Sequence, residues 1–128
     1  MINIFSLIKT LVITVLTCLA MTVQAQSTDT QPIRLIVPWP AAGNADVVGR
    51  VIAAKLSETS KRSYVVENRP GAGGNIGMEL VARAPKDGTT LGLVITANAV
   101  NMSLYPNLSF DLSNDLVAIG SISSHSTI

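Results

Sequence analysis

Short apolar runs alternate along the chain with segments whose apolar residues recur at helical spacing. The run Ile33–Val37 is rich in β-branched residues and has a proline on each side, which is typical of a largely buried strand. A second strand is predicted over 64–67, and a third over 90–95, which has almost no polar residue. Residues 115–121 fit a fourth strand.

Helical segments connect these strands. The first helix is predicted over about 45–59, with Asn44 as a suitable N-cap. Its apolar stripe comprises Val47, Val48, Val51, Ile52 and Leu56, opposite the polar residues Arg50, Lys55 and Glu58. A second helix ends at Ala84, because Pro85 disfavours helical geometry in the residue before it. Residues 96–101 form a third loop or a short helix.

This alternation of strands and helices is that of an α/β fold with an open, mainly parallel sheet. In such sheets ligands bind beyond the carboxyl ends of the strands, where the loops into the helices converge. Three loops fall at that edge here, over 38–44, 68–75 and 96–101. The sequence therefore predicts a binding site made mostly of backbone donors.

The second of these loops is rich in glycine. Three glycines lie within residues 71–74, so the backbone can adopt positive φ and approach a ligand closely. Ile76, Leu80 and Val81 then recur at helical spacing, so the loop opens a helix N-terminus with unpaired donors and a partial positive charge. Such a place suits an anion.

Two other interpretations of the glycine loop are open. It can serve only as a tight connection between strand and helix. It can also be compared with a dinucleotide site, but Gly71, Gly73 and Gly77 are spaced G-x-G-x-x-x-G, with Ile76 where the fingerprint needs its third glycine. No later strand supplies a well-placed acid for a ribose, so a nucleotide cofactor is disfavoured.

The first 25 residues have the organisation of a signal peptide. Lys9 precedes a mostly apolar run, and Val23-Gln24-Ala25 has the small residues that a signal peptidase recognises, so we expect cleavage after Ala25 and export to the periplasm. Residues 26–31 are predicted to be a flexible N-terminus. Cys18 is the only cysteine and lies inside the leader, which leaves a mature chain without an internal disulfide. An uncleaved anchor and lipidation at Cys18 are the weaker alternatives.

The balance of basic and acidic residues excludes some classes of binding partner. Without the leader, which holds one lysine and no acid, the chain has eight basic and eight acidic residues. Nucleic acids and anionic membranes select basic surfaces, so neither is expected as a partner. His125, the single histidine, has no Ser-Asp spacing and no second metal ligand nearby. We therefore predict no catalytic residue, no metal and no cofactor, and a protein that is not an enzyme.

A resemblance to a known family rests on five segments: P-I-R-L-I-V-P-W-P (32–40), N-A-D (44–46), V-V-E-N-R-P-G-A-G-G-N-I-G (65–77), D-G-T-T-L (87–91) and S-L-Y-P (103–106). Together they resemble the Bug-type extracytoplasmic solute receptors, the substrate-binding components of tripartite tricarboxylate transporters. The likeness extends from about Pro32 to Ser123. It implies a two-lobed periplasmic-binding-protein fold of type 2, of which residues 32–128 would be an incomplete first lobe.

The resemblance also implies a ligand and its site. The ligand would be a small organic carboxylate, such as a di- or tricarboxylate, an amino acid or an aromatic acid, and membrane transporter subunits would be partners of a full-length receptor. The implied ligand-binding residues are Trp39, Pro40, Ala41, Ala42, Gly43, Asn44, Gly71, Ala72, Gly73, Gly74, Asn75, Thr96 and Asn98. Family members usually have glycine where this chain has Ala42. The alternative is a small exported anion- or phosphate-binding domain or enzyme that uses the same glycine loop.

Three further side chains near these loops have two interpretations each. Asp46 lies in the first turn of the first helix, where it can cap the helix or contact the ligand. Arg69 can fix its loop by an ion pair with Glu67 or serve as the countercharge for a carboxylate. Trp39 can form a wall of the pocket or pack on the end of the sheet.

Overall fold

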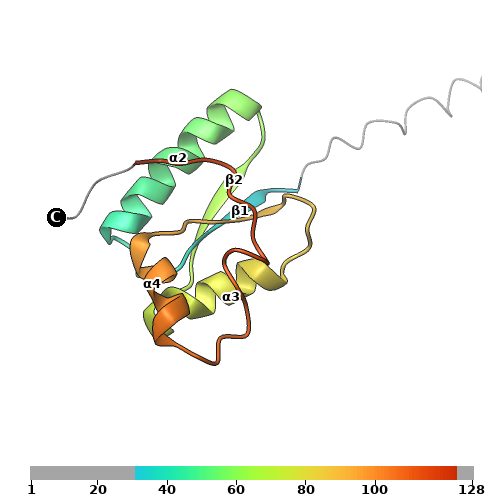
Figure 1. The fold of residues 1–128 in the computed structure, drawn as a ribbon. Helices are drawn as coiled ribbons and strands as arrows, with labels where there is room; N and C mark the ends of the chain where they lie inside the picture. Colours follow the sequence, from blue (N-terminus) through green and yellow to red (C-terminus); the bar gives the residue numbers. More distant parts are fainter. Residues whose placement is uncertain (1–30, 124–128) are drawn as a thin grey trace, which may run out of the picture. The chain divides into compact units, whose positions relative to one another are not determined.

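A computed structural model describes residues 31–123 of the chain. The predicted signal peptide, most of the predicted flexible N-terminus, Cys18 and His125 lie outside these residues. The elements in chain order are β1 (Ile33–Val37), α2 (Asn44–Ser60), β2 (Tyr64–Asn68), the 3-10 turn η2 (Ala72–Gly74), α3 (Asn75–Arg83), β3 (Thr90–Gly92) and α4 (Thr96–Leu104) (Figure 1).

The three strands form one parallel sheet with the order β2-β1-β3. From β1 the chain moves to one edge of the sheet through α2, and from β2 it crosses to the other edge through α3. Because such crossovers are right-handed, this reversal of direction places α2 and α3 on opposite faces of the sheet (Figure 1). The predicted parallel α/β class is confirmed, and the strand order reverses between β1 and β3, the point at which such sheets bind their ligands.

The core is centred on β1, which is buried almost throughout, as expected of the middle strand of a covered parallel sheet. The buried apolar residues of the core, among the described residues, are Ile33, Leu35, Ile36, Val37, Ala53, Met78, Val81, Leu93 and Phe110. Phe110 comes from the segment after α4 and packs into the core, and Nζ of Lys86 donates to the carbonyl oxygen of Asp115 at 2.8 Å, so both contacts anchor this irregular segment.

The face that α2 buries differs from the predicted one. Its buried residues are Asp46, Gly49 and Ala53, while Val51 of the expected apolar stripe is 65% exposed. A Cβ at Gly49 would lie 2.8 Å from Cγ2 of Val37, so the backbone of α2 approaches β1 more closely than a branched side chain allows. The predicted stripe was wrong at Val47, Val48 and Val51, which are exposed, because small residues provide the close contact instead. Its other two members, Ile52 and Leu56, are half-buried.

The helix also begins differently from the prediction. Asn44 is the first residue of α2, and the N-cap is Gly43, which makes no side-chain capping bond. The predicted N-cap role of Asn44 is therefore wrong. The N–H of Ala42, just before the helix, donates instead to the carboxylate of Asp46, which lies in the first turn of α2.

Two strand predictions for the last third of the chain need correction. The third strand ends at Gly92 rather than at residue 95. The helix alternative for residues 96–101 is confirmed, and this helix, α4, continues to Leu104. The predicted fourth strand over 115–121 is not formed, and its residues Val117 and Ile119 are 86% and 78% exposed. A strand needs a hydrogen-bonded neighbour, and none of the strands among the described residues pairs with this segment.

Candidate functional site

The three loops predicted to converge meet around Gly74. A Cβ at this position would lie 2.7 Å from Nδ2 of Asn98 and 3.4 Å from both the carbonyl oxygen of Pro38 and Cζ2 of Trp39. The loop after β1, the glycine loop after β2 and the first turn of α4 therefore touch one another at the carboxyl edge of the sheet. This edge is where an open α/β sheet binds its ligand.

Positive φ angles shape two of these loops. Gly71, Gly73 and Gly74 have φ values of 129°, 65° and 93°, which confirms the predicted positive φ of these glycines. Ala42, which occupies a usual glycine position of the resembled family, also has a left-handed φ of 65°. Such a conformation costs a residue with a Cβ about 1–2 kcal/mol, so neighbouring contacts must hold it.

Asp46 supplies that contact. Its carboxylate accepts the N–H of Ala42 at 2.9 Å, Nε of Arg50 at 3.0 Å and Nδ2 of Asn68 at 3.0 Å, and the residue is 3% exposed. Asn68 also donates to the carbonyl oxygen of Trp39 at 3.1 Å, which joins β2 to the loop after β1. Asp46 thus holds the loop in place by bonding its backbone, which favours the capping interpretation over direct ligand contact.

The ionisation of Asp46 is linked to folding. The Arg50 hydrogen bond, followed by the Ala42 amide, lowers the pKa of Asp46 from 3.8 to about 2. A carboxyl whose pKa is lower in the folded chain stabilises it above the unfolded pKa, and this contribution disappears as the pH falls toward 2.

We expect Asp46→Asn to be less stable than the wild type at pH 7 and to lose less stability between pH 4 and pH 2. Urea unfolding across this pH range measures both effects. Glu58→Gln, which removes a carboxylate from the exposed side of the same helix, is the matched control for charge loss. Equal pH dependence of wild type and Asp46→Asn would contradict the assignment.

Hydrogen bonds to the side-chain oxygens of Asn75 and Asn98, both near Gly74, fix the orientation of these side chains and leave their amide nitrogens without a partner. Oδ1 of Asn98 accepts the N–H of Ile95 at 3.0 Å, so Nδ2 must point the other way. Nδ2 of Asn101 donates to the carbonyl oxygen of Gly73 and to Oδ1 of Asn75, both at 2.8 Å, which leaves Nδ2 of Asn75 as the free end. Because the N–H of Ile95 can only donate and the carbonyl oxygen of Gly73 can only accept, these two hydrogen bonds determine which end of each amide is the oxygen.

These two nitrogens and the indole Nε1 of Trp39 form the donor cluster. None of the three has a hydrogen-bond partner among the described residues, and Asn75 and Asn98 are only 6% and 1% exposed. A buried donor without a partner costs about 1–3 kcal/mol. The α3 and α4 helices begin beside the cluster and add the partial positive charge of their N-termini. The arrangement suits a ligand that offers only acceptors, such as a carboxylate.

The charged residues around the glycine loop are already paired. Glu67 accepts Nη2 of Arg34 at 2.6 Å and is also bonded by Arg69, which confirms the predicted loop-fixing pair of Arg69. The Arg34 guanidinium beside Glu67 holds the pKa of that carboxyl below its usual value. Arg69 is therefore engaged on β2 by an ion pair, whereas the neutral donors of the cluster have no partner among the described residues.

The other predicted site residues surround the cluster or lie apart from it. Exposed positions on the two loops beside it are Pro40, Ala41, Ala42, Gly71, Ala72 and Gly73, and Gly43 is half-buried. Asn44 and Thr96 instead line a separate groove next to β3. Sequence reasoning missed Asn101 and Asn68, which orient the loops. The three-residue spacing of Asn98 and Asn101, which places both on one face of a helix, was the available signal.

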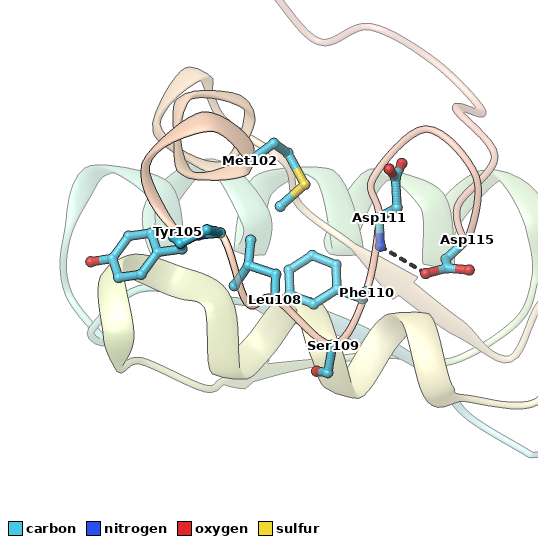
Figure 2. A pocket seen from close by; sticks show the side chains of 8 residues that line it. Met102, Tyr105, Leu108, Ser109, Phe110, Asp111 and Asp115 are labelled. Atoms are coloured by element: carbon cyan, nitrogen blue, oxygen red, sulfur yellow. Dashed lines mark hydrogen bonds between the residues drawn. The ribbon is translucent and has the colours of Figure 1, made fainter.

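A second hollow lies beneath α4 and is about 400 Å³ in volume. Figure 2 shows Met102, Leu108 and Phe110 lining it, together with Asp111, whose N–H donates to the carboxylate of Asp115 at 2.7 Å. No lysine or arginine lines this hollow, and its two carboxylates would repel an anion. The donor cluster is therefore the candidate anion site.

Within residues 31–123 no group of three or more His, Cys, Asp or Glu side chains is arranged to hold a metal ion. No helix in this part of the chain combines the length and apolar character that crossing a membrane requires.

The described residues thus combine an open α/β sheet with unpartnered nitrogen donors at its carboxyl edge, an arrangement that suits a small anion. The family profile described as tripartite tricarboxylate transporter family receptor matches residues 48–128. The chain belongs to this receptor family, as the resemblance predicted.

Individual relatives agree with this assignment. Protein BugT of Bordetella pertussis is 38% identical over 106 residues, which cover 81% of this chain and 32% of BugT. The malate-bound structure of MatC (Rpa3494) from Rhodopseudomonas palustris superposes with a TM-score of 0.62 at 30% identity, over 66% of this chain and 29% of that one. A TctC solute binding protein from Polaromonas superposes with a TM-score of 0.54 at 36% identity, over 61% of this chain and 28% of that one. The chain thus spans about a third of the length of its curated relatives. The Polaromonas protein is described as a solute binding protein, and a further structure, with a TM-score of 0.62 at 36% identity, is described as a periplasmic transporter.

Proposed function

We propose that this chain is part of a periplasmic receptor that captures a small organic carboxylate for a tripartite tricarboxylate-type transporter. It is exported through the signal peptide of residues 1–25, and residues 32–128 contribute to the first lobe of the receptor. The transporter subunits in the membrane are its protein partners.

The donor cluster is the observation that carries this proposal. Three nitrogen donors, one from the loop after β1 and one each from the first turns of α3 and α4, lie at the carboxyl edge of the sheet, and no oxygen of the described residues accepts from them. A carboxylate offers two oxygens with about four acceptor positions, so one group can satisfy several donors at once. A protonated amine offers only donors and finds no partner there.

The comparisons support a carboxylate as the ligand class. The chain belongs to a family of tricarboxylate transporter receptors, and MatC was solved with malate. The ligand-binding residues that we propose are Trp39, Asn75 and Asn98 as side-chain donors, with the backbone of 39–44 and 71–74 around them. Thr96, which lines the groove beside β3, is not among the ligand contacts that we propose.

Titration of the 128-residue chain with malate tests the proposal. We expect saturable binding in the millimolar range, about 4 kcal/mol, because a receptor closes two lobes on its ligand and this chain supplies contacts from one side. Dimethyl malate, which has the same carbon skeleton without the negative charges, is the matched control and should not bind. Equal binding of the diester, or none by either compound, would contradict a carboxylate site.

A further inference from the structure

The buried side of α4 is polar. Its two buried residues, Asn98 and Asn101, are both asparagines and lie three positions apart on one face of the helix. Burying an amide costs free energy unless its polar atoms are bonded, so a helix that only packs would bury apolar side chains there. Asn98 belongs to the donor cluster, whereas Asn101 is bonded to Gly73 and Asn75.

The side-chain nitrogen of Asn101 carries two hydrogens and uses both. It donates to the carbonyl oxygen of Gly73 and to Oδ1 of Asn75, each at 2.8 Å. A main-chain carbonyl can only accept, so it requires the nitrogen end of Asn101 on this side. That nitrogen in turn requires the oxygen end of Asn75. The nitrogen end of Asn75 is therefore the one left for the donor cluster, where no described residue accepts from it.

The glycine at position 73 makes room for this contact. A Cβ on Gly73 would lie 3.2 Å from Nδ2 of Asn101, which is tighter than ordinary van der Waals contact. Its φ of 65° also disfavours any residue with a side chain. Gly73 and Asn101 are 28 positions apart, so their hydrogen bond joins the glycine loop directly to α4. Both elements contribute to the candidate site.

We propose that Asn101 is a positioning residue that sets the hydrogen-bonding polarity of the site. It relays the acceptor character of the Gly73 carbonyl to Asn75, so that Asn75 offers a donor to the ligand, and it does not itself touch the ligand. An acceptor in place of the Asn101 nitrogen would turn the Asn75 amide over, and the oxygen then presented repels a carboxylate. The carboxylate comes from the proposed function, on which this inference rests, but the orientation of Asn75 is measurable in the free chain.

Asn101→Asp tests this orientation without any ligand. An aspartate at this position accepts, so the side-chain amide of Asn75 should become hydrogen-bonded and exchange its protons with water at least about 10-fold more slowly. Proton–nitrogen correlation spectra of the 128-residue chain measure this exchange. Asn107→Asp, the same change at an exposed position after α4, is the matched control and should leave Asn75 unchanged. Unchanged Asn75 exchange in a folded Asn101→Asp chain overturns the proposal.

A double-mutant cycle in malate binding tests whether Asn101 acts through Asn75, and it does not require Asn101→Asp to fold. Asn101→Leu keeps a side chain of similar size and removes both hydrogen bonds. This variant and Asn75→Ala should each weaken malate binding by about 10-fold. The double variant should also lose about 10-fold, because Asn101 then has nothing left to orient.

A loss of about 100-fold in the double variant overturns the proposal, since the two residues would then act independently. Absence of malate binding by the wild-type chain contradicts the proposed function instead. The exchange of the Asn75 amide in Asn101→Asp then decides the role of Asn101 by itself.

Discussion

Gly74→Ala is expected to destabilise the folded chain by about 2–5 kcal/mol, the largest effect of any single methyl addition to the candidate site. The added Cβ would lie 2.7 Å from Nδ2 of Asn98, far below an ordinary contact distance. Asn98 cannot yield easily, because its Oδ1 bonds the amide of Ile95 and the residue is almost fully buried. The φ of 93° at Gly74 adds backbone strain for any residue with a Cβ.

Substitutions at two other glycines distinguish the cost of the steric clash from the cost of backbone strain. Gly88 has a φ of 77° and nothing within 4 Å of an added Cβ, so Gly88→Ala reports strain alone, about 1–2 kcal/mol. Gly77 has helical φ, but its Cβ would lie 2.7 Å from Cβ of Pro38 and 2.8 Å from the carbonyl oxygen of Arg69, so Gly77→Ala reports the clash. Urea unfolding measures all three variants. A Gly74→Ala loss no larger than that of Gly88→Ala would mean that the loops do not meet at Gly74.

Asn98→Asp is expected to abolish malate binding, with an affinity loss of at least about 100-fold at pH 7. The aspartate can still accept the N–H of Ile95 through one oxygen, so the first turn of α4 keeps its cap. The other oxygen replaces a donor of the cluster with a negative charge at the position we assign to the ligand carboxylate. Two like charges in a site with little water repel each other strongly.

Binding titrations of this variant need a control on the same helix. Thr96→Val removes the hydroxyl of an exposed residue in the first turn of α4. Thr96 lines the separate groove next to β3 and not the donor cluster. The substitution should leave malate affinity within about 2-fold of the wild type. Wild-type affinity in Asn98→Asp, with the fold intact by circular dichroism, would exclude Asn98 from the ligand contact.

The features that local rules govern could be predicted from the sequence. The apolar β-branched run of β1, the parallel alternation and the positive φ of Gly73 follow from periodicity and from the backbone freedom of glycine. The loops that meet at Gly74 were predicted as well, because the carboxyl ends of parallel strands share one edge.

The features that depend on packing between distant residues could not be predicted. The buried face of α2 is set by how closely Gly49 lets the helix approach Val37, a distance that hydropathy does not report. Residues 115–121 have a strand's composition, but a strand also needs a neighbouring edge, and no local pattern supplies it. Asn75 and Asn101 are 26 positions apart and are joined by a hydrogen bond that only the fold creates. The direction in which Nδ2 of Asn75 points could therefore not be predicted from local sequence.

The side-chain N–H signals of the donor cluster in a proton–nitrogen correlation spectrum test the central claim most directly. During titration of the wild-type chain with malate, the indole signal of Trp39 and the amide pairs of Asn75 and Asn98 should move together, with one dissociation constant. The amide of Asp111, beside the hollow under α4, should stay in place. Movement of the Asp111 signal while the three donor signals remain fixed would contradict the proposed site.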